Sequence, residues 1–150
     1  MKKIFYLIVI VISFALVSCA SSKSTTTISD GFNITDYKHV VYGDDDKEGD
    51  AELADILLLV QNELSRKMLA VSASDALQLI NSDKKVISPR INVKSEKWGG
   101  GHTYITISFY DFKTNQLVAV IKSSGIGLTI SQDQKVAFSA IKKELNKVFK

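Results

Sequence analysis

The residues with the clearest capacity for chemistry form an acidic run between Asp44 and Asp55. Asp44, Asp46 and Glu48 occupy alternate positions, Gly49 follows directly, and Asp55 lies further along the chain. Calcium prefers several oxygen ligands, and alternating carboxylates with a glycine at the bend allow one loop to surround such an ion. The run is therefore a candidate calcium site made of Asp44, Asp46, Glu48 and Asp55.

The spacing resembles the loop of EF-hand calcium proteins, with Asp44 at the first position, Gly49 at the sixth and Asp55 at the twelfth. Three features depart from that family. A strand is expected before the loop, aspartate replaces the longer glutamate at the last position, and Ala51 stands where a branched apolar residue is usual. The alternative is a solvated turn whose carboxylates cap the next helix, and we favour that turn over calcium.

Groups suited to acid–base or nucleophilic catalysis are sparse. His39 and His102 are the only histidines, and they do not form a closely spaced ligand pair. The single cysteine has another use, described below, and no serine stands in a G-x-S-x-G or S-x-x-K pattern. We therefore expect a protein that is not an enzyme and that needs no cofactor. A small enzyme whose site residues are dispersed along the chain is the alternative.

Four aromatic residues form a candidate partner surface. Trp98 lies at the base of a glycine loop, where a tryptophan offers a large apolar area to a partner or caps the end of a core. Tyr104, Tyr110 and Phe112 share one face of a predicted strand. We expect these three side chains to be exposed if helices cover only one side of the sheet, and buried if helices cover both.

The N-terminal segment predicts export from the cytoplasm. Two lysines precede residues 4–17, in which Ser13 is the only polar side chain, and a small serine stands before the only cysteine. This order is that of a secretory signal peptide. Fourteen helical residues reach roughly 21 Å, which is short of the ~30 Å hydrocarbon core of a bilayer. We therefore expect residues 1–18 to be a cleaved leader rather than a membrane span, and residues 4–17 to be helical.

The sequence Leu16-Val17-Ser18-Cys19 resembles the lipobox of bacterial lipoproteins. The resemblance implies that the leader is cut before Cys19, that its sulfur carries diacylglycerol and that the new amine is acylated. Several acyl chains give stable membrane anchoring, whereas one chain gives only marginal binding. Ala20 is not aspartate, which by the sorting rule for such lipoproteins favours the outer membrane over the inner membrane. An ordinary secreted protein with a cysteine near the cut is the alternative.

These features predict a lipid-anchored component of the bacterial cell envelope that binds or assembles with an envelope protein. Removal of the leader leaves 17 basic and 16 acidic residues. The alkaline isoelectric point therefore arises mostly from the leader and does not indicate nucleic-acid binding. With Cys19 lipidated, no cysteine is left for a disulfide, so the domain must be stabilised by its core.

The small polar residues of 19–30, without apolar periodicity, predict a flexible tether after the lipidated cysteine. Residues 31–150 are expected to form a single domain. Apolar periodicity predicts helices over about 50–67, from Ser72 to about 80 and from about Ser131 to the C-terminal end, and strands at 37–42, 86–97, 103–112 and 117–123. Ser72 with Asp75, and Ser131 with Gln134, resemble capping boxes, so the two serines are the predicted N-caps of the second and third helices. Pro89 cannot donate to a ladder and predicts that its strand lies at an edge or is bulged there. This order predicts an α+β fold of two layers, in which two main helices pack on one face of an antiparallel sheet of about four strands.

Overall fold

The computed structural model describes residues 20–43, 51–96 and 101–150, and it describes side chains of the second range from residue 54 onward. Residues 1–19, which include the predicted leader and its predicted helix, lie outside this part. The elements are, in chain order, β1 (Ser21–Ile28), the 3-10 turn η1 (Ile34–Asp36), β2 (His39–Val40), α2 (Ala51–Ser65), β3 (Leu69–Ala70), α3 (Ala73–Asn81), β4 (Val86–Ser95), β5 (His102–Asp111), β6 (Leu117–Ile126) and α4 (Ile130–Val148).

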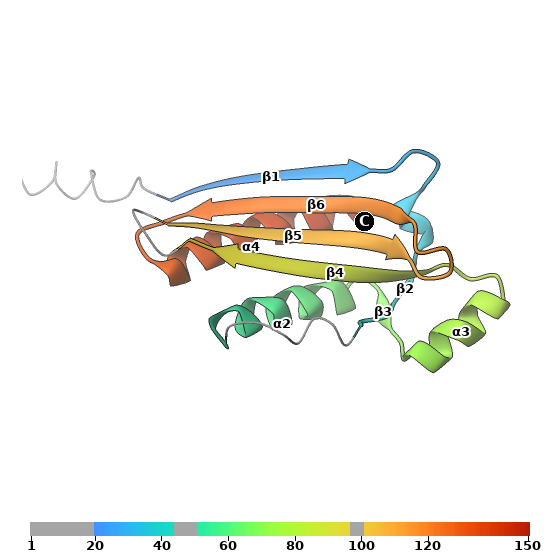
Figure 1. Ribbon diagram of the computed structural model, residues 1–150. Coiled ribbons are helices and arrows are strands. Elements are labelled where there is room, and N and C mark those ends of the chain that lie inside the picture. The colour runs from blue at the N-terminus through green and yellow to red at the C-terminus, as the bar shows by residue number, and fades with distance from the viewer. Residues whose placement is uncertain (1–19, 44–50, 97–100) are drawn as a thin grey trace, which may run out of the picture.

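The strands form one mixed sheet in the order β1-β6-β5-β4-β2-β3 (Figure 1). β1, β6, β5 and β4 run antiparallel to their neighbours, whereas β2 pairs in parallel with both β3 and β4. The predicted antiparallel sheet of about four strands with two main helices is therefore wrong, because the described residues form a sheet of six strands of mixed direction together with three α-helices. The parallel pairs arise because α2 returns the chain to the same end of the sheet between β2 and β3.

The segment predicted to be a flexible tether forms the edge strand β1. All eight of its residues pair with β6, from Ser21 opposite Ile126 to Ile28 opposite Ala119. The Ser24 hydroxyl donates to Oε1 of Glu144 at 2.9 Å, and the Thr26 hydroxyl donates to Oε2 of the same carboxylate at 3.0 Å. A polar strand is stable here because the buried carboxylate of α4 accepts from its inward side chains.

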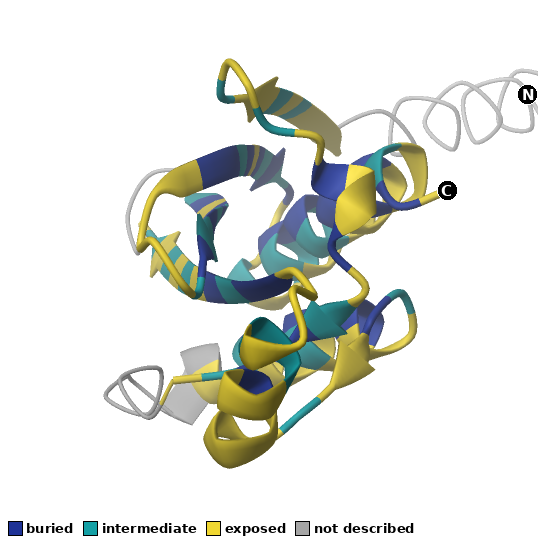
Figure 2. Cartoon of the chain, turned by 90° about the vertical axis from the view of Figure 1, so that its right-hand side faces the viewer, coloured by how far each residue is buried: buried dark blue, intermediate teal, exposed yellow. Residues whose placement is uncertain are grey.

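The two long helices cover one face of the sheet and leave most of the other face open. The short helix α3 packs instead against Val41 and Val86, which alternate with the core residues Val40 and Ile87 and so point to the other side. α4 packs against β1, β5 and β6, and α2 packs against α4 and β4 on the same side. Figure 2 shows the buried residues in dark blue where these layers face each other. The core is made of aliphatic and aromatic side chains, among them Ile34, Tyr37, Val60, Leu64, Ile105, Ile107, Phe109, Ile121, Ile141 and Leu145. Two of the helices, α2 and α4, lie on one face as predicted for the main helices, but α3 and the mixed six-stranded sheet depart from the predicted fold.

α4 lies very close to β6. The Ser123 hydroxyl donates to the Ala137 carbonyl at 2.9 Å. A side chain at Gly125 would collide with the backbone of Asp133 and Ala137. Glycine is therefore needed at this position so that helix and strand can touch.

Two helix starts test the predicted caps. Ser72 is the N-cap of α3 and its hydroxyl accepts from the N–H of Asp75, as predicted. The cap of α4 is Thr129, whose hydroxyl accepts from the N–H of Gln132, rather than Ser131. The helix therefore starts two residues earlier than its sequence pattern predicts.

The sheet has two ends that matter for function. We call the end formed by Ser21, Ser95, His102 and Ile126 the near end, because β1 begins there, and the end formed by Ile28, Val86, Asp111 and Leu117 the far end. β5 runs the whole way between them in ten residues, which corresponds to roughly 30 Å. Near and far ends thus face opposite directions (Figure 1).

Candidate functional site

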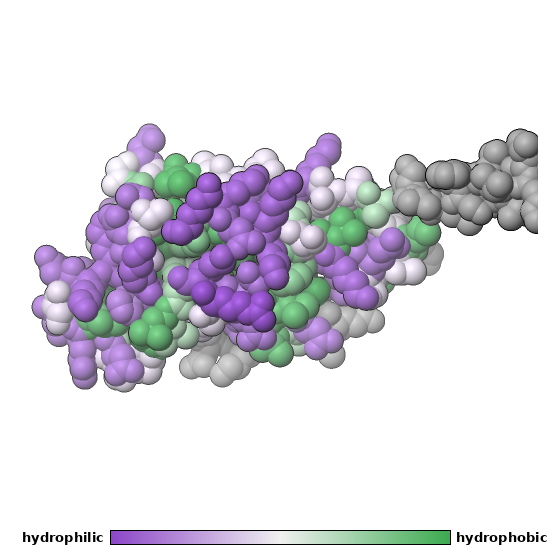
Figure 3. Space-filling model, turned by 180° about the vertical axis from the view of Figure 1, so that it is seen from behind, coloured by the Kyte–Doolittle hydropathy of each residue, from purple (hydrophilic) through white to green (hydrophobic). Residues whose placement is uncertain are grey.

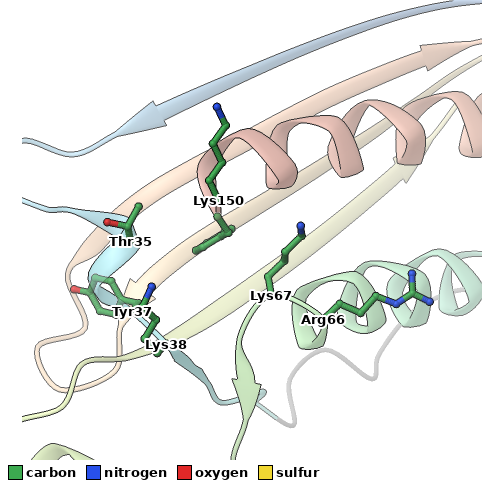
Figure 4. Close-up of a pocket in the computed structure, with 7 residues that line it drawn as sticks. Thr35, Tyr37, Lys38, Arg66, Lys67 and Lys150 are labelled. Atoms are coloured by element: carbon green, nitrogen blue, oxygen red, sulfur yellow. The ribbon is translucent and has the colours of Figure 1, made fainter.

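A pocket rich in cations opens at the far end of the fold. Its cavity has a volume of about 230 Å³. We call it the basic pocket, and its lining residues are Thr35, Tyr37, Lys38, Arg66, Lys67, Phe149 and Lys150 (Figure 4). They come from stretches that are distant in sequence: the turn before β2, the residues after α2, and the residues after α4.

Backbone hydrogen bonds hold these stretches in place. The N–H of Lys67 donates to the Leu64 carbonyl at 2.9 Å, which closes the last turn after α2. The Lys38 carbonyl accepts from the N–H of Leu69 at 2.9 Å, which ties the start of β2 to β3. The two lysines are therefore positioned by the end of a helix and by a strand pair, rather than by a free loop.

The floor of the basic pocket is aromatic and rigid. Tyr37 is buried, and its hydroxyl donates to Oδ2 of Asp111 at 2.9 Å. The other oxygen of Asp111 accepts from the N–H groups of Lys113 at 3.0 Å and Thr114 at 2.8 Å. This carboxylate therefore fixes both the β5–β6 turn and the tyrosine.

The surroundings of Tyr37 and Asp111 shift the pKa values of these two groups in opposite directions. Burial raises the pKa of Tyr37 well above its usual value, and the hydrogen bond to Asp111 adds to the increase. Burial by itself would raise the pKa of Asp111, but the hydrogen bonds from Thr114, Tyr37 and Lys113 outweigh it and lower the pKa. Tyr37 therefore stays a neutral hydrogen-bond donor, and its role in the basic pocket is structural.

The charge of the basic pocket is positive. Four of its seven lining residues are cationic, and none of the seven is acidic. Of these four cations, only Arg66 forms an ion pair among the described residues, with Glu63 at 3.3 Å. Figure 4 shows the Arg66 guanidinium lying back along α2. The nearest acid along the chain, Asp36, is paired with Lys85 at 2.8 Å. An incoming anion would therefore meet ammonium groups not already neutralised.

Two of these cations also suit the helix that precedes them. Arg66 and Lys67 follow the C-terminus of α2, where positive charge interacts favourably with the unpaired carbonyl groups. That explanation does not extend to Lys38, which lies before a strand. The basic pocket therefore has cationic groups of the kind that bind carboxylate, phosphate or sulfate oxygens.

Most of the predicted calcium site lies outside the part of the chain that the structure describes. Asp44, Asp46 and Glu48 lie outside the described residues, and Asp55 is exposed on α2. Within the described part of the chain, no group of three or more His, Cys, Asp or Glu side chains is arranged to hold a metal ion. The calcium prediction therefore stays a prediction.

The two histidines lie at opposite ends of the sheet. His39 is in β2 opposite Val86 at the far end, and its Nδ1 is buried without a hydrogen-bond partner. His102 begins β5 at the near end, where its ring stacks on Tyr104 with centroids 5.9 Å apart. They therefore cannot share a ligand or a reacting group.

The predicted aromatic surface is divided by the structure. Trp98 lies outside the described residues. Tyr104 is exposed and Tyr110 half-buried on the open face, six residues apart and thus roughly 20 Å from each other. Phe112 is instead half-buried against the small cluster of Val41, Ala76 and Val86. The three aromatics that the structure describes are therefore spread out and do not form one compact patch.

The open face of the sheet carries positive charge, as the basic pocket does. The register places four cations on this face: Lys23, Arg90, Lys94 and Lys122. The guanidinium of Arg90 lies over the Tyr110 ring at 4.6 Å from its centroid. Sequence reasoning missed both cationic surfaces, because their members are scattered along the chain and only the register brings them together.

The predicted lipid attachment site, Cys19, precedes the described residues. β1 begins two residues after it, with only Ala20 between. In the described part of the chain, no helix has the combined length and apolar character that crossing a bilayer requires.

Comparisons with known proteins identify a shared fold. No protein-family model matches the chain, and no curated protein does so either. Similar solved structures include two dodecamers of PelC from Paraburkholderia phytofirmans. One of them, a single-residue variant, aligns with a TM-score of 0.51 and 17% identity over 86% of this chain and 98% of that chain. The other aligns with a TM-score of 0.50 and 16% identity at the same coverage.

A PDZ domain protein from Parabacteroides distasonis aligns less well, with a TM-score of 0.47 and 11% identity over 89% of this chain and 38% of that chain. At 17% identity or below, likeness to these structures concerns the fold alone.

Proposed function

We propose that this protein is a lipid-anchored binding or assembly component of the bacterial cell envelope. The anchor is the lipid on Cys19, supported by the sequence Leu16-Val17-Ser18-Cys19 behind a charged and then apolar leader. Ala20 directs the protein to the outer membrane rather than the inner membrane. The domain then binds an anionic group of an envelope partner through the basic pocket.

The observation that carries the binding role is that one pocket is lined by three lysines from three separate stretches of chain, Lys38, Lys67 and Lys150, with no acidic side chain among its lining residues. Hydrogen bonds from cationic groups to carboxylate or phosphate oxygens are stronger than hydrogen bonds between neutral groups. The aromatic floor of the basic pocket excludes water and so strengthens these hydrogen bonds further. The basic pocket lies at the far end of the sheet, roughly 30 Å from the start of β1. A partner in the aqueous compartment would therefore reach it without meeting the lipid surface.

Metabolic labelling with palmitate tests the anchor. We expect label on the full-length protein, loss of label in the Cys19→Ala variant, and retention of the leader when the lipoprotein signal peptidase is inhibited. An unlabelled protein recovered from the soluble fraction would refute the anchor.

An NMR titration of the mature protein in detergent micelles with inorganic phosphate tests the basic pocket. The amide signals of Lys38, Lys67 and Phe149 should shift with phosphate, and not with chloride at equal ionic strength. Substituting Lys38→Gln and Lys67→Gln together should weaken binding about tenfold or more, since one charged hydrogen bond contributes about 1.5 kcal/mol or more.

The matched control removes two exposed lysines outside the basic pocket, as Lys84→Gln with Lys113→Gln. Net charge falls equally in both double variants, so a general charge effect would weaken phosphate binding equally. That equality would refute the basic pocket as a specific site. A parallel titration with acetate separates carboxylate from phosphate preference.

A further inference from the structure

The start of β1 places the proposed lipid anchor against the folded domain. Ser21 already pairs with Ile126, and only Ala20 separates it from Cys19. Consecutive Cα atoms are about 3.8 Å apart, so the Cys19 Cα lies within roughly 8 Å of the Ser21 Cα. β1 is itself held to α4 through Glu144. A lipid on Cys19 therefore cannot hold the domain at a distance from the bilayer.

An exposed leucine lies at the same end of the fold. Leu128, in the connection between β6 and α4, is 74% exposed, more than any other large hydrophobic residue of the described chain. It follows by two residues Ile126, the register partner of Ser21. Figure 1 shows that this connection and the start of β1 lie at the same end of the sheet. Figure 3 shows apolar (green) surface beside the point where the described chain begins.

The loop that carries Leu128 is held in a defined conformation. The N–H of Leu128 donates to Oε1 of Gln132 at 2.9 Å, and the Thr129 hydroxyl accepts from the N–H of Gln132 at 3.2 Å. A side chain at Gly127 would lie only 2.7 Å from Cγ of Gln132. The loop therefore packs closely on the first turn of α4 while the leucine side chain remains in solvent. An isolated exposed leucine is ordinary on a protein surface, but this one lies beside the proposed anchor.

We propose that the near end of the fold docks directly on the bilayer that holds the Cys19 lipid, with Leu128 inserted at the boundary between headgroups and acyl chains. This inference rests on the proposed lipidation of Cys19. The leucine adds an apolar contact to the acyl chains, and together they fix the orientation of the domain. The strands then run away from the membrane, and the basic pocket faces the aqueous compartment.

Fluorescence quenching on the full-length lipidated protein tests the docking. In the Leu128→Cys variant the only free thiol is at residue 128, because the Cys19 sulfur carries lipid, so an NBD fluorophore can be attached there alone. The protein is reconstituted into phosphatidylethanolamine–phosphatidylglycerol vesicles that contain doxyl-labelled lipid. The matched control is Leu77→Cys, which labels an exposed leucine of α3 beyond the far end.

We expect a blue-shifted spectrum and several-fold stronger quenching at residue 128 than at residue 77. A second variant inserts a Gly-Ser linker of about ten residues between Ala20 and Ser21, which gives the domain a flexible tether. This insertion should lower the quenching at residue 128 towards that of the control, while palmitate labelling stays unchanged.

The outcomes separate docking from lipidation. A protein that retains palmitate but shows equal quenching at residues 128 and 77 overturns the docking and leaves the anchor intact. The probe at residue 128 could also be shielded from aqueous iodide in cell envelopes without being quenched by doxyl lipid. That result would assign Leu128 to a protein contact and would also overturn the docking on the bilayer. Absence of palmitate on Cys19 overturns docking and anchor together.

Discussion

Removal of the Glu144 carboxylate should release β1 from the domain. Glu144 is buried and accepts hydrogen bonds from Ser24 at 2.9 Å and Thr26 at 3.0 Å. A hydrogen bond to a charged group contributes about 1.5–3 kcal/mol, and both hydroxyls are half-buried and regain water when released. The Glu144→Ala variant should therefore lower the free energy of opening β1 by about 2–4 kcal/mol, which corresponds to a roughly 30- to 700-fold loss of protection.

Hydrogen–deuterium exchange followed by mass spectrometry measures this effect. Peptides from β1 should lose protection in the Glu144→Ala variant, whereas peptides from the central strand β5 should change much less, since local opening need not unfold the whole domain. The control is Lys147→Met, which removes the 2.7 Å ion pair to Glu144 from a half-exposed partner. Glu144 is buried but Lys147 is half-exposed, so solvent partly screens this pair. Its loss should cost about 1 kcal/mol and leave the two hydrogen bonds from β1 to Glu144 in place. Unchanged protection of β1 in the Glu144→Ala variant would refute the role of the carboxylate.

Three further predictions concern stability. Tyr37→Phe removes the donor to Asp111 and should destabilise the domain by about 1–2 kcal/mol in urea unfolding, with a change under 0.5 kcal/mol contradicting the role of this bond. Gly125→Ala places a methyl group against the backbone of Ala137 and should cost about 1–3 kcal/mol in the same assay, whereas wild-type stability would mean that α4 can move aside. The pKa values of Asp111 and Glu144 are lowered in the folded protein. Their contribution to stability is therefore complete above the unfolded pKa of about 4 and is lost as the pH falls through the folded pKa values. A melting temperature that does not fall in this acid range would contradict this contribution.

Local pattern was sufficient for the long elements. Apolar residues at helical spacing predicted α2, and strict alternation predicted β4 and β5, because one side of each element faces the core. The N-cap of α3 at Ser72 could also be predicted, because the cap depends on residues only three positions apart. Pro89 was expected at an edge or bulge, and it lies in the part of β4 beyond the two residues that pair with β2, where only β5 is a neighbour. These features depend on short sequence distances.

Composition was misleading for β1. Its serines and threonines suit a linker as well as a strand, and nothing near them in sequence decides between the two. The deciding partners are β6, about a hundred residues away, and Glu144, which is 120 positions from Ser24. β2 lies within the strand predicted at 37–42 but is only two residues long, and β3 is equally short. Two paired residues carry almost no periodicity, so the extent of such strands depends on distant partners.

By itself the sequence determined the positions of the long helices and strands and raised the expectation of a lipid on Cys19, because each of these depends on residues that are neighbours along the chain. Only the tertiary structure decided that β1 joins the sheet, and that Leu128 lies at the same end of the sheet as the start of β1. The basic pocket, too, exists only in the fold, because Lys38, Lys67 and Lys150 meet through strand pairing and helix packing. Contacts between distant residues decide these features, and their free energy has no signature in any local stretch of sequence.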